Sequence, residues 1–165
     1  MKRWPAREVT RLGLLTGTAV ILFVLESLVP RPLPWVRLGL ANLPVMLALF
    51  LHGFGPALGV SLAKVFLGGL FSGTLGGPAT MLALGASVSS LGAMAAVRRW
   101  CCGVFSPVGV SVIGAVVHQV VQLALAARLI GHGGVWALLP LAVVAGVGSG
   151  GGIGLLARWS LGRLR

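Results

Sequence analysis

The residues of this chain that could bind a ligand are a few polar side chains set within or beside long apolar stretches. They are Glu26, Arg37, Asn42, Lys64, His118, Gln119 and Gln122. A charged side chain at the centre of a bilayer costs at least about 2.5–3.5 kcal/mol, so Glu26 and Lys64 need partners there. A buried ammonium suits an anionic group. We therefore expect Lys64 above all to contact a ligand, and we expect that ligand to be a small organic molecule with an anionic group.

Each of these residues also has a purely structural interpretation. Glu26 and Lys64 could pair with each other or with Arg37 and so hold the helices together. His118 and Gln122 lie one turn apart on the same helix face, where an interhelical hydrogen bond is the commoner role. If these polar groups all formed hydrogen bonds or ion pairs with one another and enclosed no cavity, we would interpret the chain as a membrane assembly factor.

Several kinds of chemistry are excluded by what the sequence lacks. It contains no Asp and two Glu, whereas magnesium-dependent phosphoryl or prenyl transfer relies on clustered carboxylates. The carboxylate that orients the His of a catalytic triad is missing as well. The glycine run Gly146–Gly154 lies in an apolar segment and lacks the Lys of a phosphate-binding loop, so close helix packing or a flexible break fits it better. We expect no catalytic residue, no metal site and no cofactor.

The composition places the chain in a membrane. Of its 165 residues 57% are hydrophobic and 9% are charged, and the mean hydropathy is +1.02. A soluble domain has about a quarter charged residues. The net charge of +11 does not predict nucleic-acid binding, because the basic residues stand at the ends of apolar runs, where they act as topology signals. We expect one membrane domain over residues 1–165, in contact with the lipid bilayer.

The apolar runs predict an all-α bundle of six transmembrane helices. Their expected bounds are about 12–29, 36–51, 57–71, 79–97, 107–127 and 135–157. The breaks between them are marked by Pro and Gly, as in Ser72–Pro78 and Gly131–Gly134. The second and third runs are short for a full crossing, so five crossings or a re-entrant segment is the alternative.

The distribution of basic residues favours six crossings with both ends in the cytoplasm. Nine of them then face inward and three outward, in agreement with the positive-inside rule. The inward ones are Lys2, Arg3, Arg7, Arg11, Arg98, Arg99, Arg158, Arg163 and Arg165, and the outward ones are Arg31, Arg37 and Arg128. In this topology the polar residues occupy the middle and outer half of the membrane. Arg37 lies at the outer rim, and Asn42 faces Glu26 across the bundle and Lys64 below.

Four segments of the sequence resemble one known family. They are Glu26 with Pro30 and Pro34, RLGLAN at 37–42, Lys64 followed by LGGLFSG at 67–73, and SVIGAVVHQVVQL at 111–123. In order and spacing they are similar to the Gx transporter family, whose members are often labelled heptaprenyl diphosphate synthase component I. The resemblance covers roughly residues 10–160. The chain departs from the family pattern at Gln119 and Val121, and in having Lys64 where Arg is common.

This resemblance implies a fold and a function. The Gx family in turn resembles the S components of energy-coupling-factor transporters, six-helix proteins that capture a small molecule from outside. The resemblance therefore implies that this chain is a substrate-binding subunit in a prokaryotic plasma membrane and that it works with a transmembrane coupling subunit and two ATPases. S components dock through small residues of the first helix, which Gly13 and Gly17 match; ordinary packing within the chain is the alternative for these glycines. The alternative function is an accessory, non-catalytic subunit of heptaprenyl diphosphate synthesis.

Overall fold

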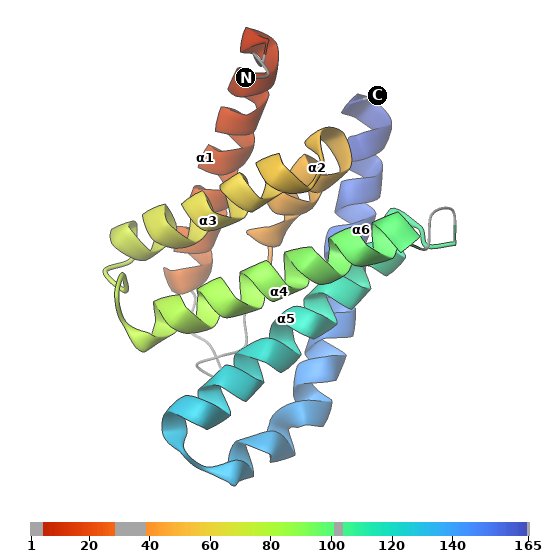
Figure 1. Cartoon of the computed structure of the whole chain (residues 1–165). Coiled ribbons are helices and arrows are strands. Elements are labelled where there is room, and N and C mark those ends of the chain that lie inside the picture. Colours follow the sequence, from red (N-terminus) through yellow and green to blue (C-terminus); the bar gives the residue numbers. More distant parts are fainter. Residues whose placement is uncertain (1–4, 29–38, 101–103, 165) are drawn as a thin grey trace.

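The computed structural model describes residues 5–28, 39–100 and 104–164. The described residues form six α-helices and one short 3-10 helix, and no strand occurs among them. The elements are α1 (Ala6–Leu28), α2 (Asn42–His52), α3 (Phe54–Phe71), α4 (Pro78–Trp100), α5 (Pro107–Ile130), η1 (Gly133–Leu138) and α6 (Leu139–Leu164) (Figure 1). The all-α bundle of six helices expected from the sequence is confirmed.

Five helical segments are long and apolar enough to cross a membrane, and α2 is the exception. It has 11 residues, which span about 16 Å, roughly half of the hydrocarbon core. Glycines set both of its ends. Gly39, at φ +78°, opens a turn in which the Asn42 N–H donates to the Gly39 carbonyl (2.8 Å), and Gly53, at φ +91°, ends the helix.

The second helix is therefore shorter than the range 36–51 expected from the sequence. The expected range includes Gly39, which lies before α2 in the structure. Its positions 36–38 lie outside the described residues, as does the proline-rich stretch 30–34. The other helices differ from expectation mainly at their ends. The first begins at Ala6, six residues early, and the last begins at Leu139, after η1, and continues to Leu164. The breaks expected at 72–78 and 131–134 are present.

The helices form two groups of three. In the N-terminal half, α1, α2 and α3 all pack against one another, and in the C-terminal half α5 lies between α4 and α6. The two halves meet chiefly where α3 contacts α4 and where α2 contacts α6. The start of α1 and the end of α6 lie at the same end of the bundle (Figure 1). This agrees with an even number of crossings.

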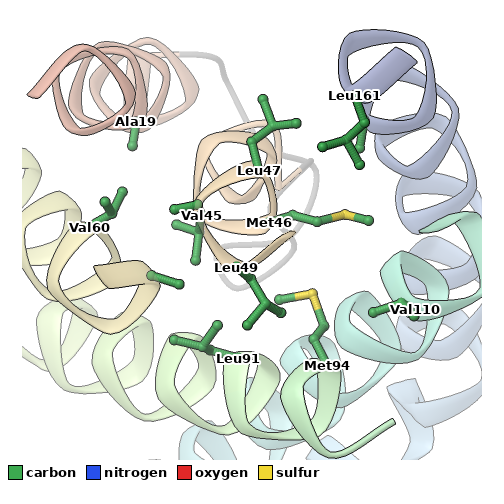
Figure 2. Close-up of a cluster of buried hydrophobic side chains, with 13 residues drawn as sticks. Ala19, Val45, Met46, Leu47, Leu49, Val60, Leu91, Met94, Val110 and Leu161 are labelled. Carbon is green, nitrogen blue, oxygen red and sulfur yellow. The ribbon is translucent and has the colours of Figure 1, made fainter. Parts of the chain in front are cut away.

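The hydrophobic core is centred on α2. The six consecutive residues 44–49 are all buried, so this helix has no lipid-facing side, as expected for a helix that is apolar all round. Figure 2 shows it enclosed by the other helices. The surrounding side chains are Ala19 of α1, Val60 of α3, Leu91 and Met94 of α4, Val110 of α5 and Leu161 of α6.

Three glycines of α6 allow its backbone to lie directly against α5. A Cβ built on Gly146, Gly150 or Gly154 would come within 2.6–3.0 Å of a Cα atom of α5, that of Val116, Val112 or Val108 respectively. The four-residue spacing on both helices makes this an antiparallel small-residue interface. Helix α6 is continuous through the glycine run. Of the two roles expected for the run, close packing is therefore the one that the structure supports.

Arg98 of α4 joins the two halves at the far end of α2. Its guanidinium donates to the backbone carbonyls of Leu49 and Phe50 (the latter at 3.3 Å) and lies 4.9 Å from the centre of the Phe50 ring. The last carbonyls of a helix have no partner within it. Arg98 thus gives the Phe50 carbonyl a donor and adds a second one to the Leu49 carbonyl, which also accepts from the Gly53 N–H at 3.2 Å.

Replacing Arg98 with alanine is expected to lower the free energy of unfolding by about 1.5–3 kcal/mol, because buried carbonyls lose charged donors. Thermal unfolding of the purified protein in detergent measures the loss. Arg99→Ala is the matched control, since the neighbouring Arg99 is exposed. Equal losses in the two variants would show that Arg98 contributes only as a surface charge.

Candidate functional site

Lys64 is the most deeply buried charge of the site. It lies on α3, 2% of its surface is exposed, and its Nζ donates to Oδ1 of Asn42 at 2.6 Å. A charged donor makes a shorter and stronger hydrogen bond than a neutral one. This bond offsets part of the cost of burying the ammonium and fixes the Asn42 side chain at the start of α2.

Glu26 holds the start of α2 from the other side. Its side chain is 6% exposed on α1, and Oε1 accepts a hydrogen bond from the Ala41 N–H at 3.4 Å. Ala41 immediately precedes α2 and offers no side-chain cap. A carboxylate is favourable at a helix N-terminus, where the free N–H groups carry partial positive charge. An acid on α1 therefore compensates for the missing cap of α2.

A small cavity brings together four of the residues predicted to form the site. One polar side chain comes from each of five helices: Glu26 from α1, Asn42 from α2, Lys64 from α3, Ser87 from α4 and His118 from α5. We call it the ionic cavity. Its volume is about 10 Å³, which is room for about one water molecule. Glu26, Asn42 and Lys64 thus line one cavity.

A second cavity adjoins the first and carries no charged side chain among its described lining. Its volume is about 20 Å³, and it shares Gly39, Asn42 and His118 with the ionic cavity. We call it the neutral cavity. Its other polar side chains are Ser90 of α4, Ser111 and Gln119 of α5 and Ser149 of α6, and its large apolar ones are Met46, Met94 and Ile153. It therefore lies where α2 meets the C-terminal half.

The remaining predicted site residues lie elsewhere. Gln122 is 2% exposed, but it lines neither of these two cavities, and its Oε1 has no hydrogen-bond partner among the described residues. Arg37 lies outside the described residues. Gly13 and Gly17 are exposed on α1, with nothing within 4 Å of a Cβ built on either. Packing against the described residues therefore does not account for these two glycines.

Reasoning from the sequence missed the serines. Ser87, Ser90, Ser111 and Ser149 all line a cavity, and Ser90 also donates to the Gly114 carbonyl at 2.7 Å. A small hydroxyl in an apolar helix is common at helix–helix contacts, so its type alone gives no signal. The spacing of the serines in the sequence gives a weak signal. Ser111 lies seven residues, about two turns, before His118 and so shares its face.

The described lining of the two cavities has groups that form ionic contacts and hydrogen bonds, and few that suit bond-breaking chemistry. The described residues bring one carboxylate, one ammonium, one imidazole and several neutral hydrogen-bonding groups to the cavities. Both Glu residues of the chain lie on α1, Glu8 in its first turn and Glu26 near its end. Eighteen residues of helix separate them by about 27 Å. Within one copy of the chain they cannot share a metal ion.

Comparison with known protein families gives a match over most of the chain. The model of the family described as heptaprenyl diphosphate synthase component I matches residues 15–159. The chain belongs to this family. The resemblance found in the sequence is thereby confirmed. The residues that line the two cavities all fall within the matched range of the heptaprenyl diphosphate synthase component I family. No curated protein and no solved structure matches the chain.

Proposed function

We propose that this chain is the substrate-binding membrane subunit of an uptake system for a small organic solute. The observation that carries the proposal is the ionic cavity. Glu26, Asn42, Lys64 and His118 converge there from four helices of a bundle with five helices long enough to span a membrane. Ionisable residues inside a membrane are costly, and where they meet at a cavity they commonly mark a substrate pathway.

A separate energy-coupling module completes the proposal. Five helical segments of the described chain have the length and composition of membrane spans, and the segments between the helices are far too short to form a nucleotide-binding domain. We therefore assign the use of ATP to other chains. The exposed face of α1 around Gly13 and Gly17 is the surface we assign to the coupling subunit, because small residues let another helix approach closely.

Replacing Gly17 with leucine tests this surface. The variant is expected to keep the thermal stability of the wild type, since the added side chain meets open space, and to lose co-purification with the coupling subunit when both are expressed together. Gly152→Leu is the matched control, because Gly152 is also exposed in a membrane-spanning helix and has open space beside it. If the Gly17 variant co-purified with the coupling subunit as the wild type does, α1 would not be the docking surface.

The second candidate function is an accessory subunit of heptaprenyl diphosphate synthesis. The family description favours it. The chain would then act on a catalytic partner, because it has no Asp and its two Glu are far apart. Reconstituting a heptaprenyl diphosphate synthase with and without this chain tests the idea. An unchanged rate and an unchanged product length would exclude it.

Ligand binding by the purified protein separates the two functions. For the first, we expect thermal unfolding to shift upward with one class in a panel of vitamins, their precursors and other small organic solutes, because a ligand that binds the folded state stabilises it. For the second, the shift comes with prenyl diphosphates or with the catalytic partner. If no small solute stabilised the protein and cells expressing it took none up, the transport proposal would be wrong.

A further inference from the structure

A larger pocket lies beyond the last turn of α2, at the end of this helix away from the two cavities. Its volume is about 470 Å³, within the range of about 300–1,000 Å³ that is usual for ligand sites. The turn between α2 and α3 forms one wall, and the last turns of α4 form the other. The lining includes Leu49, Gly53 and Phe54 on the first wall and Ala96, Arg98 and Arg99 on the second. We call it the arginine pocket.

The arginine pocket is basic. Arg98 and Arg99 bring two positive charges to it, and its described lining has no acidic side chain. Arg98 is held by carbonyls of α2, which are neutral and leave its charge uncancelled, and Arg99 is exposed. The start of α3 at Phe54, which has no side-chain cap, adds partial positive charge. The charge of the pocket therefore favours an anion.

The arginine pocket lies at the level of lipid headgroups. Because successive helices run in opposite directions, α2 and α4 both end on the side where α1 starts. In the topology that the basic residues favour, this side faces the cytoplasm, and the cytoplasmic leaflet carries anionic lipids. Trp100 follows Arg99 and is 80% exposed, and tryptophan is enriched at the membrane–water interface. The anions at this level are the phosphates of phospholipids.

The pocket also has an apolar part that suits an acyl chain. Phe54 is 47% exposed, and Leu49 and Ala96 lie in the same lining. A free phosphate gains nothing from these side chains. A phospholipid, in contrast, can place its phosphate at the arginines and the first part of its chain against the apolar wall, where burial of apolar surface is favourable. The pairing of the two surfaces favours a lipid over a soluble anion.

We propose that the arginine pocket binds the phosphate headgroup of one anionic phospholipid of the cytoplasmic leaflet. Arg99 contacts the phosphate, and Arg98 adds its charge while it holds the end of α2. One wall of the pocket belongs to the N-terminal half of the bundle and the other to the C-terminal half. The bound lipid thus joins the two halves and stabilises the folded protein. The inference is independent of solute binding.

Adding lipids to the delipidated full-length protein in a neutral detergent tests the site. Thermal unfolding is followed with phosphatidylglycerol, phosphatidylcholine and glycerol phosphate at equal concentrations, and native mass spectrometry measures the affinity for each lipid. We expect phosphatidylglycerol to raise the unfolding temperature and the other two to leave it nearly unchanged. An equal rise with phosphatidylcholine would show that the pocket does not select a charge. An equal rise with glycerol phosphate would show a site for soluble anions. Either result would overturn the proposal.

Replacing Arg99 with alanine assigns the charge. The variant is expected to bind phosphatidylglycerol at least about fivefold more weakly, the factor that one basic residue contributes near an anionic lipid surface, and to unfold at the wild-type temperature without lipid. Arg158→Ala is the matched control, because Arg158 is exposed near the end of α6, on the same side of the bundle, and does not line the pocket. Equal losses in the two variants would mean diffuse attraction to a basic surface and would overturn the site.

Replacing Ala96 with phenylalanine tests the pocket itself. The variant keeps both arginines and puts a larger side chain into the lining, so it is expected to weaken phosphatidylglycerol binding several-fold. Wild-type affinity in this variant would place the lipid outside the pocket and contradict the proposal. If Ala96→Phe does not fold, the comparison of Arg99→Ala with Arg158→Ala still decides the question.

Discussion

Replacing Lys64 with methionine is expected to lower solute affinity about 100-fold. The loss of affinity follows because the anionic group of the solute would be buried without its charged partner, which costs about 2–5 kcal/mol. Asn42 also loses its 2.6 Å hydrogen bond to Lys64, at about 1–3 kcal/mol, so thermal stability is measured beside affinity.

Binding measured by calorimetry and uptake measured in cells both report this change. Lys64→Arg is the control, since it keeps the positive charge and its donors, and it is expected to retain most of the affinity. A methionine variant that takes up solute at the wild-type rate would show that Lys64 serves only to hold α2 in place.

Replacing Gly150 with valine is expected to lower the free energy of unfolding by overpacking the contact between α5 and α6. Its Cβ would lie 2.7 Å from the Cα of Val112 and 3.0 Å from the carbonyl oxygen of Ser111, and these backbone atoms cannot move without separating α5 from α6. Overpacking of this kind costs about 1–3 kcal/mol. For a chain of this size the unfolding temperature would fall by about 3–10 °C.

Gly148→Val is the matched control for this effect. Gly148 belongs to the same glycine run and the same helix, but it is exposed and has no atom within 4 Å of a built Cβ. Thermal unfolding in detergent is expected to separate the two variants clearly. Similar losses in both would mean that valine destabilises this part of α6 on either face, and not through contact with α5.

The sequence allowed the convergence of the charged residues to be predicted, because lipid imposes a simple rule. Glu26 and Lys64 are too costly to face hydrocarbon, so they had to point into the bundle, and Asn42 had to lie near them once the topology was set. Asn42 is one partner of Lys64 in the structure, and the sequence offered Glu26 and Arg37 as partners as well. Type and depth of a residue predict that it faces inward. They do not select among several polar neighbours.

Other features could not be predicted from the sequence for physical reasons. A hydropathy profile does not show that Gly39 adopts a positive φ and that α2 begins only after it, since glycine is common within transmembrane helices. The cavity serines are another case. A serine that lines a cavity and a serine that packs against a helix have the same pattern in sequence, and only the packing of helices separates them.

The short central helix has a mechanical consequence. Its first residue, Asn42, contacts Lys64 at the ionic cavity, and its last turn is held by Arg98 of the other half. Eleven residues form one helix between these points, a rod of about 16 Å whose hydrogen bonds are internal. If a solute bound as proposed, a displacement of Asn42 would be passed along the rod without an intervening loop. The occupied and empty states of the cavity would then differ at the Arg98 end of α2 as well.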